Sequence, residues 1–155
     1  VLHMNRCAPW LATTRLPWMA DLPPGQPINM IDAMLHPEGM TKPITNLEEV
    51  APALLAHLRD DASVVPDILP RVEQLAQKLQ QRLGKRVLTP WQRQMAPVLT
   101  TRFATRHGEL AFFSMFSTFG TPQDITLASL RVEHVFPADE VTRAVLTAQL
   151  SQIGT

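Results

Sequence analysis

The stretch from residue 100 to residue 139 constrains the fold more than any other part of the sequence. Residues 98–105 combine apolar and small side chains with threonines, a mixture typical of a half-buried β-strand. The dipeptide His107-Gly108 follows, and glycine can take the positive φ that a tight reversal needs. Further apolar segments follow at 109–119 and 130–136, the last alternating with period two. The sequence therefore predicts a short antiparallel meander of three strands.

The second of these strands is apolar on both faces. Its alternate positions are Leu110, Phe112 and Phe116 on one face and Ala111, Phe113, Met115 and Phe119 on the other. A strand of this kind must be covered on both faces or must line an apolar space. It is either a central strand between helices and its sheet neighbours, or part of the wall of a ligand cavity, since small-molecule pockets are mostly apolar. The pattern is compatible with both interpretations.

Helical patterns occupy much of the remaining chain. The segment 66–83 has apolar residues at helical spacing and is followed by Gly84 and two basic residues, which suits a helix end. A helix over about 46–61 opens with Thr45-Asn46 and two glutamates, a cap and first-turn acids. The other predicted elements are a strand at 1–4, a helix after Asn5, a helix at 28–35, a helix or turn from Thr89, and a closing helix capped by 137–140 with Val141, Ala144, Val145 and Ala148 on its apolar side. This order has no βαβ alternation and predicts an α+β fold in a single domain, residues 1–155.

Composition narrows the class of protein. The chain has 155 residues, enough for one domain with a hydrophobic core. Its 14 basic residues equal its 14 acidic ones, which argues against a stand-alone nucleic-acid binder. No apolar run reaches the roughly 18 residues of a membrane span, and no signal peptide is recognisable. Because Cys7 is the single cysteine, no internal disulfide can form and we expect a cytoplasmic protein. The chain starts with Val1 in a structured pattern, so we expect an excised part of a longer protein.

Residues for catalysis or metal binding form no recognisable set. The five histidines lack zinc-ligand spacing, and Cys7 near His3 has no accompanying nucleophile motif. The acidic pairs at 48–49 and 60–61 are adjacent on helices, so their carboxylates point apart. No glycine-rich phosphate loop is present in the sequence. We therefore expect no metal, no cofactor and no enzymatic activity.

Polar side chains in the predicted sheet are candidates for contact with the head group of a ligand. Arg102 or Arg106 would pair with an anionic head, with ordinary solvated surface as the alternative. His134 has the same parity as Val132 and Phe136, which we expect to face inward. It would then offer a polar group to a ligand, or make a hydrogen bond within the core.

Several segments, in their order along the chain, resemble a known family. The opening VLHMNR is similar to the strand, asparagine and apolar helix that begin PAS-like modules. NMIDAMLHPEGM at 29–40 and ITNLEEVA at 44–51 resemble the leucine-rich, His-Pro and Asn-Trp-Glu-Glu-Val-Ala landmarks of the MmyB-like ligand-binding domain. The Phe-rich strand from Gly108 and the segment 130–139 resemble its closing strands and helix. The chain departs from the pattern at Leu47, where the family often has Trp.

The resemblance implies a PAS-like fold, an antiparallel sheet with helices packed over one face and an apolar pocket between them. In this family the domain follows an N-terminal helix-turn-helix of the XRE type in bacterial transcription regulators. The pocket is suspected to take a fatty acid or a similar small apolar molecule. The sequence lacks the helix-turn-helix, so DNA would be contacted only through that absent domain. The implied function is ligand sensing, and we expect a homodimer with no membrane partner.

The composition suits such a pocket. Seven methionines and six phenylalanines give adaptable walls for an elongated apolar ligand. The predicted lining residues are Met34, Leu35, Leu54, Leu58, Arg102, Phe112, Met115, Phe116, Val132, His134 and Phe136. The alternative is that these residues close-pack without a void. A second hypothesis for the domain is a dimerisation module without a ligand, whose apolar surface meets a partner.

Overall fold

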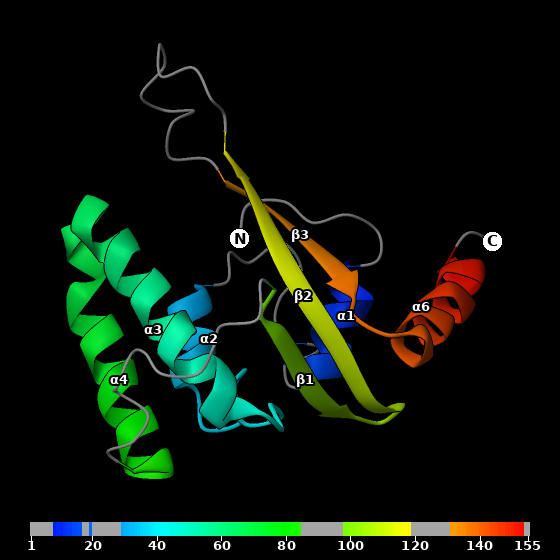
Figure 1. Ribbon diagram of the computed structural model, residues 1–155, viewed down its shortest axis with the longest axis horizontal. Helices are drawn as coiled ribbons and strands as arrows, with labels where there is room; N and C mark the ends of the chain where they lie inside the picture. The colour runs from blue at the N-terminus through cyan, green and yellow to red at the C-terminus, as the bar shows by residue number, and fades with distance from the viewer. Residues whose placement is uncertain (1–7, 17–18, 20–28, 85–97, 119–130, 154–155) are drawn as a thin grey trace.

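The structure, a computed structural model, describes residues 8–16, 19, 29–84, 98–118 and 131–153. Helices and a three-stranded antiparallel sheet make up this part of the chain, which confirms the predicted α+β fold. In chain order the elements are α1 (Ala8–Arg15), α2 (Met30–Leu35), α3 (Leu47–Val64), a 3₁₀ turn (Pro66–Ile68), α4 (Leu69–Leu83), β1 (Thr100–Thr105), β2 (Gly108–Thr118), β3 (Arg131–Pro137) and α6 (Glu140–Ile153). Figure 1 shows the sheet between the group α2, α3 and α4 on one side and α6 on the other.

Helices α3 and α4 lie side by side and bury the apolar stripe that the sequence predicts for 66–83. Val72, Leu75 and Leu79 of α4 are fully buried in the core. The guanidinium of Arg59 on α3 donates to both carboxylate oxygens of Glu73 on α4, at 2.9 and 3.2 Å. Apolar packing holds helices α3 and α4 together, because an exposed ion pair such as Arg59–Glu73 contributes only about 0.2–1 kcal/mol.

Two asparagines precede helices and play different parts. The side chain of Asn29 caps α2 and accepts hydrogen bonds from the backbone N–H groups of Ile31 and Asp32, at 3.0 and 3.3 Å. Asn46 precedes α3, but its side chain makes no capping bond. The predicted cap interaction at Asn46 is therefore wrong, since this side chain is used elsewhere.

The segment that precedes α3 runs beside the outer edge of β1. The Asn46 carboxamide accepts a hydrogen bond from Arg102 N–H at 2.9 Å and donates one to the Thr100 carbonyl at 2.9 Å. Ala104 N–H donates to the Pro43 carbonyl at 2.8 Å. These bonds take the place of a neighbouring strand, so the backbone polar groups of β1 are paired along both edges.

The register of the sheet assigns each side chain to a face. Phe112 lies opposite Thr101 and Pro137, and Phe113 lies opposite Phe136. Directly paired residues of an antiparallel sheet share a face. The face termed the inner face carries Phe103, Leu110, Phe112, Phe116 and Val135, and the face termed the outer face carries Arg102, Phe113, Met115, Val132, His134 and Phe136.

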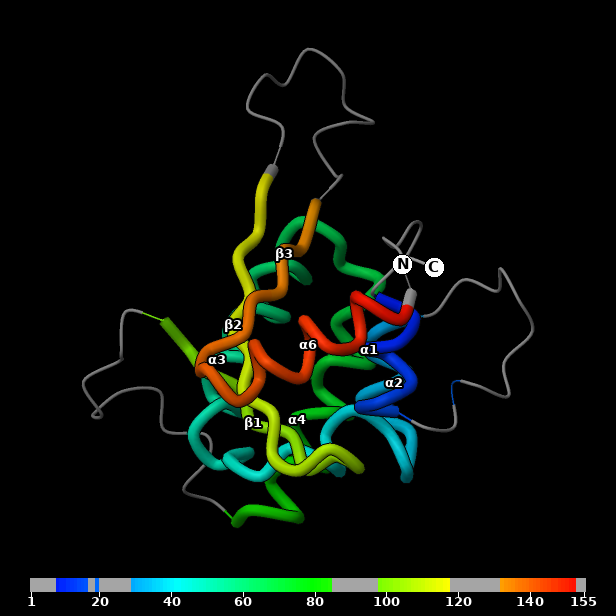
Figure 2. Tube along the Cα trace, turned by 90° about the vertical axis from the view of Figure 1, so that its right-hand side faces the viewer, coloured from blue at the N-terminus to red at the C-terminus, as the bar shows by residue number. Residues whose placement is uncertain are grey.

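Burial separates the two faces. On the inner face Phe103, Leu110 and Phe112 are 3%, 0% and 2% exposed, whereas on the outer face Met115 and Phe136 are 58% and 39% exposed. Helices α1 and α3 pack against the inner face, and α6 lies on the other side of the sheet from α3 (Figure 1). Figure 2 shows the far end of β2 and β3 extending beyond the ends of the helices.

Helix α6 is attached to the first half of β2, at Ala111. Asp139 caps the helix by accepting a hydrogen bond from Thr142 N–H at 2.7 Å. The buried Thr142 hydroxyl accepts one from Ala111 N–H at 2.9 Å. This attachment turns Thr142, Val145 and Leu146 toward the protein and leaves Val141 64% exposed. The prediction that Val141, Ala144 and Ala148 lie on a packed apolar side of this helix is therefore wrong, because all three are exposed, whereas Val145 packs against the core.

Some predicted features lie outside the described residues. They are the strand at 1–4, the cap at Asn5, Cys7, the helix or turn from Thr89, and the apolar positions Phe119 and Leu130. The helices that the structure does describe include none with both the length and the apolar character needed to cross a bilayer.

Candidate functional site

The inner face of the sheet is covered at one end by α1, whose last residue, Arg15, is half-buried. The Arg15 guanidinium carbon lies 5.0 Å from the ring centre of Phe103 and 5.8 Å from that of Phe112. Both distances allow cation–π attraction. Burial lowers the pKa of Arg15, and the nearby carboxylate of Glu133 acts in the opposite direction. An arginine still remains charged at neutral pH, so a positive charge lies beside two aromatic rings of the core.

Five of the predicted lining residues belong to the core beneath the inner face, and a sixth, Phe116, lies at the edge of that face. Met34, Leu58 and Phe112 are buried, and Leu35 and Leu54 are partly buried against them. Phe116 is at the far end of this wall, 51% exposed, with its ring stacked on His57 of α3 at 5.2 Å. The apolar wall thus runs from a closed core to a position open to solvent.

The other five predicted lining residues lie on the outer face. Arg102, Met115, Val132, His134 and Phe136 are all exposed. A nitrogen of the His134 ring lies 3.0 Å from the Ser117 hydroxyl, and the rings of Phe113 and Phe136 stack at 5.2 Å. The expectation that His134 faces inward is wrong, because the pairing of Met115 with His134 places both on the outer face.

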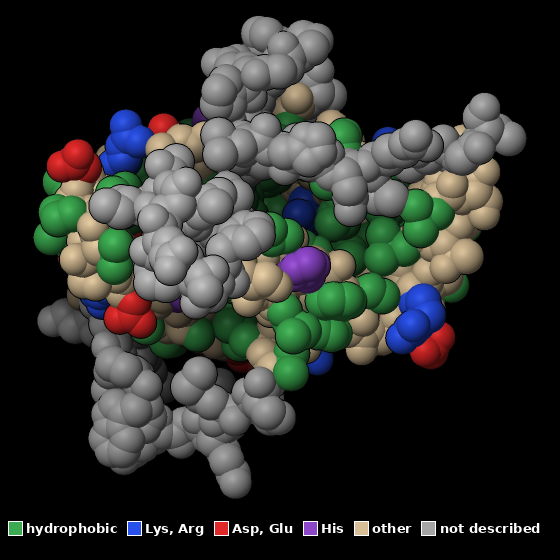
Figure 3. Space-filling model, turned by 90° about the horizontal axis from the view of Figure 1, so that it is seen from above, with side chains coloured by type: hydrophobic (Ala, Val, Ile, Leu, Met, Phe, Trp, Pro, Cys, Tyr) green, Lys and Arg blue, Asp and Glu red, His purple; other side chains and the backbone are tan. Residues whose placement is uncertain are grey.

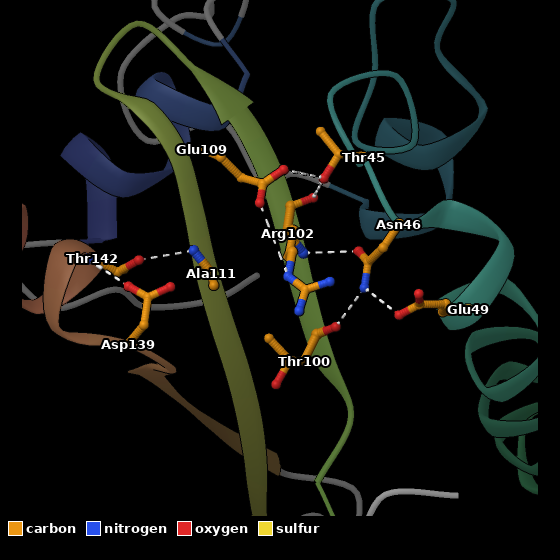
Figure 4. Close-up of polar contacts among 9 residues, drawn as sticks. All are labelled: Thr45, Asn46, Glu49, Thr100, Arg102, Glu109, Ala111, Asp139 and Thr142. Atoms are coloured by element: carbon orange, nitrogen blue, oxygen red, sulfur yellow. Dashed lines mark hydrogen bonds and ion pairs between the residues drawn. The ribbon is translucent and has the colours of Figure 1, made fainter. Parts of the chain in front are cut away.

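Among the described residues, a polar cleft of about 480 Å³ lies where the start of α3 meets the end of α4 and β1. Its walls include Thr45, Asn46, Glu49, Arg102 and Glu109 (Figure 4). The Arg102 guanidinium lies 4.0 Å from the Glu109 carboxylate, and Thr45 donates to that carboxylate at 2.8 Å. Arg102 is thus engaged by a neighbouring acid, and the polar lining does not suit an elongated apolar ligand.

Figure 3 shows one face of the protein, on which hydrophobic side chains cluster. Hydrophobic side chains gather around a histidine in the middle of this view, beside a hollow whose walls are hydrophobic and which has a basic side chain at its bottom. Such a combination of apolar walls and a few polar groups is typical of small-molecule sites.

The described residues contain no group of three or more His, Cys, Asp or Glu side chains that could hold a metal ion. The acidic pairs that the sequence singled out are exposed or half-buried on α3. Glu48 and Glu49 lie in the first turn of α3, where acidic residues favour the helix dipole, and the pair at 60–61 lies near the surface of the same helix.

Sequence reasoning missed the role of α1. The sequence predicts a helix after Asn5 but assigns no function to Arg15. A signal does exist in the sequence, since Arg15 follows the small-residue run from Ala12 to Thr14 on a helix that otherwise contains no charge. Only the packing of α1 on the inner face shows that this charge lies over the rings of Phe103 and Phe112.

The chain was compared with protein families, curated proteins and solved structures. No curated protein and no solved structure matches the chain. A family model described as "MmyB-like transcription regulator ligand binding domain" matches residues 1–148. This match covers nearly the whole chain, including α1, the sheet and most of α6. The chain belongs to the family of MmyB-like transcription regulator ligand binding domains.

Proposed function

We propose that this domain senses a small apolar molecule of the fatty-acid type, bound between the inner face of the sheet and the helices α1, α2 and α3. Membership of the family supports a regulatory role and not a catalytic one. The observation that carries the choice of ligand is the apolar wall, which runs from buried Phe112 to half-exposed Phe116. A chain of methylene groups entering at Phe116 would gain about 0.8 kcal/mol for each group removed from water.

Sensing requires that the ligand bind two arrangements of the domain with different affinity. In the proposed mechanism the ligand changes the packing of α1 and α3 on the inner face. The longer protein would carry a helix-turn-helix of the XRE type, act in the cytoplasm and contact DNA through that domain alone. The altered packing would change how a pair of these helix-turn-helix domains meets its operator.

Neighbouring residues on opposite faces of β2 provide the test. Phe116→Ala removes an aromatic ring from the inner wall, whereas Met115→Ala removes an apolar side chain of similar exposure from the outer face. Dodecanoic acid titrated calorimetrically should bind the Phe116→Ala variant about tenfold more weakly, a loss of about 1.4 kcal/mol. Met115→Ala should bind like the wild type. Equal effects of the two substitutions would contradict an inner-face site.

A second candidate function is dimerisation without a ligand, favoured by the exposed apolar side chains of the outer face. Met115, Val132 and Phe136 are 58%, 41% and 39% exposed. A two-fold interface uses the same patch on both copies, and an uncharged apolar patch is complementary to itself. Met115→Glu should then dissociate the dimer in sedimentation experiments, while Phe116→Ala should not. Native mass spectrometry with organic extraction separates the candidates, because a co-purifying lipid favours sensing and an empty homodimer favours dimerisation.

A further inference from the structure

Two buried hydrogen-bond donors on helix α1 have no acceptor in the part of the chain that the structure describes. Neither the indole N–H of Trp10 nor the hydroxyl of Thr14 has a hydrogen-bond partner among the described residues. Thr14 is only 5% exposed. Leaving such a group buried and unpaired costs about 1–3 kcal/mol, and most buried polar groups in proteins are paired. Two unpaired donors on one helix of eight residues therefore require an explanation.

The neighbouring threonine shows what is unusual about Thr14. The Thr13 hydroxyl bonds the carbonyl groups of Pro9 and Trp10 within its own helix, at 3.0 and 3.1 Å. This is the ordinary local solution for a threonine in a helix. The Thr14 hydroxyl does not use it. Trp10 and Thr14 are four positions apart, so they lie on the same side of α1.

Arg15, the next residue, adds a positive charge to this set. Within the described part of the chain, its guanidinium faces the rings of Phe103 and Phe112 and forms no ion pair with a carboxylate. The Glu133 carboxylate, which lies on the inner face nearby, accepts a hydrogen bond from the Ser114 hydroxyl at 2.7 Å. By contrast Arg59, Arg71, Arg102 and Arg143 each have a carboxylate partner.

The chemistry of these groups specifies the complementary ligand. A guanidinium and an indole N–H can only donate, and a hydroxyl can do so as well. A carboxylate accepts up to about four hydrogen bonds and pairs with arginine in a flat, two-point geometry. A cation would be repelled by Arg15. Because the buried surroundings are Leu11, Phe103 and Phe112, the rest of the ligand must be apolar.

We propose that Trp10, Thr14 and Arg15 form a head-group site that takes the carboxylate of an aliphatic acid, whose tail lies along the inner face. This inference rests on the proposed sensing function and makes it more specific. Arg15 distinguishes an acid from a neutral alcohol of the same length. Thr14 and Trp10 fix the position of the carboxylate oxygens.

The test compares dodecanoic acid with dodecan-1-ol, which has the same chain length and no charge. The wild-type domain should bind the acid at least tenfold more tightly than the alcohol in calorimetric titrations. Arg15→Met should lose at least tenfold in affinity for the acid and keep its affinity for the alcohol. Thr14→Val should weaken acid binding about threefold to tenfold, whereas Thr14→Ser, which keeps the hydroxyl, should not.

Two further arginine variants serve as controls for the effect of Arg15→Met. Arg143→Met removes an exposed arginine from α6 and should change neither affinity. Arg15→Lys keeps a charge at the same place, so it serves if Arg15→Met fails to fold, and it should retain part of the preference for the acid. Equal binding of acid and alcohol by the wild type, or an unchanged preference in Arg15→Met, would overturn the head-group site while leaving the sensing function in place. Failure of both ligands to bind would overturn both proposals.

Discussion

The hydroxyl of Thr142 accepts a hydrogen bond from Ala111 N–H at 2.9 Å, so a side chain of α6 completes the backbone pairing of β2. Thr142 is fully buried, and no water can replace it without a rearrangement. Valine has nearly the same shape as threonine but no acceptor. Thr142→Val should therefore lower the free energy of unfolding by about 1–3 kcal/mol in urea denaturation, because Ala111 N–H loses its partner. Thr142→Ser, which keeps the oxygen, should cost only the lost methyl, about 0.8 kcal/mol. Equal losses in the two variants would refute this role.

The stability of α6 should depend on pH through Asp139, which caps this helix. The hydrogen bond from Thr142 N–H, the bond from the Thr142 side chain and the charge of Arg102 lower the pKa of Asp139 below its ordinary value of 3.8. A carboxylate with a lowered pKa contributes stability that is present above the unfolded-state pKa and is lost as the pH falls through the folded-state value. The midpoint temperature of thermal unfolding should thus fall below about pH 4, as Asp139 is protonated and its bond to α6 weakens. Asp139→Ala should cost about 1 kcal/mol at pH 7.

Asn provides the matched control for this pH effect. Asp139→Asn keeps an oxygen for Thr142 N–H but cannot titrate, and asparagine caps helices about as well as aspartate. The difference in stability between wild type and Asp139→Asn should shrink as the pH falls from 5 toward 2. A constant difference across this range would show that the charge of Asp139 plays no part.

Asn46 serves as a neighbour for β1, and its replacement should be detected at the strand. Asn46→Ala leaves Arg102 N–H and the Thr100 carbonyl without their partners. We expect a loss of about 1–2 kcal/mol. Amide hydrogen exchange at Arg102 should accelerate in Asn46→Ala. Asn46→Asp keeps the acceptor and should protect that amide, although the Thr100 carbonyl loses its donor. Unchanged protection in Asn46→Ala would refute the assignment.

The ion pair between Arg59 and Glu73 should matter much less. Both side chains are nearly half exposed, at 44% and 47%. The hydrogen bond from Arg59 lowers the pKa of Glu73, but solvent screens such pairs. A double-mutant cycle with Arg59→Met and Glu73→Gln should give a coupling of about 0.2–1 kcal/mol, reduced further in 1 M salt. A coupling above about 2 kcal/mol would mean that the pair is shielded from solvent.

The sequence predicts those parts of the fold that depend on local periodicity. The leucine stripe at 66–83 is confirmed by α4, although its first turn is a 3₁₀ turn and the α-helix begins at Leu69. The strands near 98–105, 109–119 and 130–136 are confirmed as β1, β2 and β3, within a few residues. In each case neighbouring residues along the chain carry enough information.

Relations between distant segments were not predictable in this way. The parity of β3 relative to β2 decides whether His134 faces inward, and it depends on the register across residues 119–130. A shift of one position would reverse every side chain of β3. The polar role of Asn46 toward β1 and the position of Arg15 over Phe103 likewise depend on contacts between residues that are far apart in sequence. The split of the predicted lining residues between the two faces follows from this register.

Occupation of the β1 edge has a consequence for assembly. The segment 43–46 already uses the hydrogen-bonding groups that β1 would offer to another chain. An incoming strand, from this protein or from another, would have to displace that segment or join the sheet beyond β3. Within the described residues β3 (Arg131–Pro137) is the other edge strand of the sheet, so a β-mediated partner that leaves segment 43–46 in place would pair on that side.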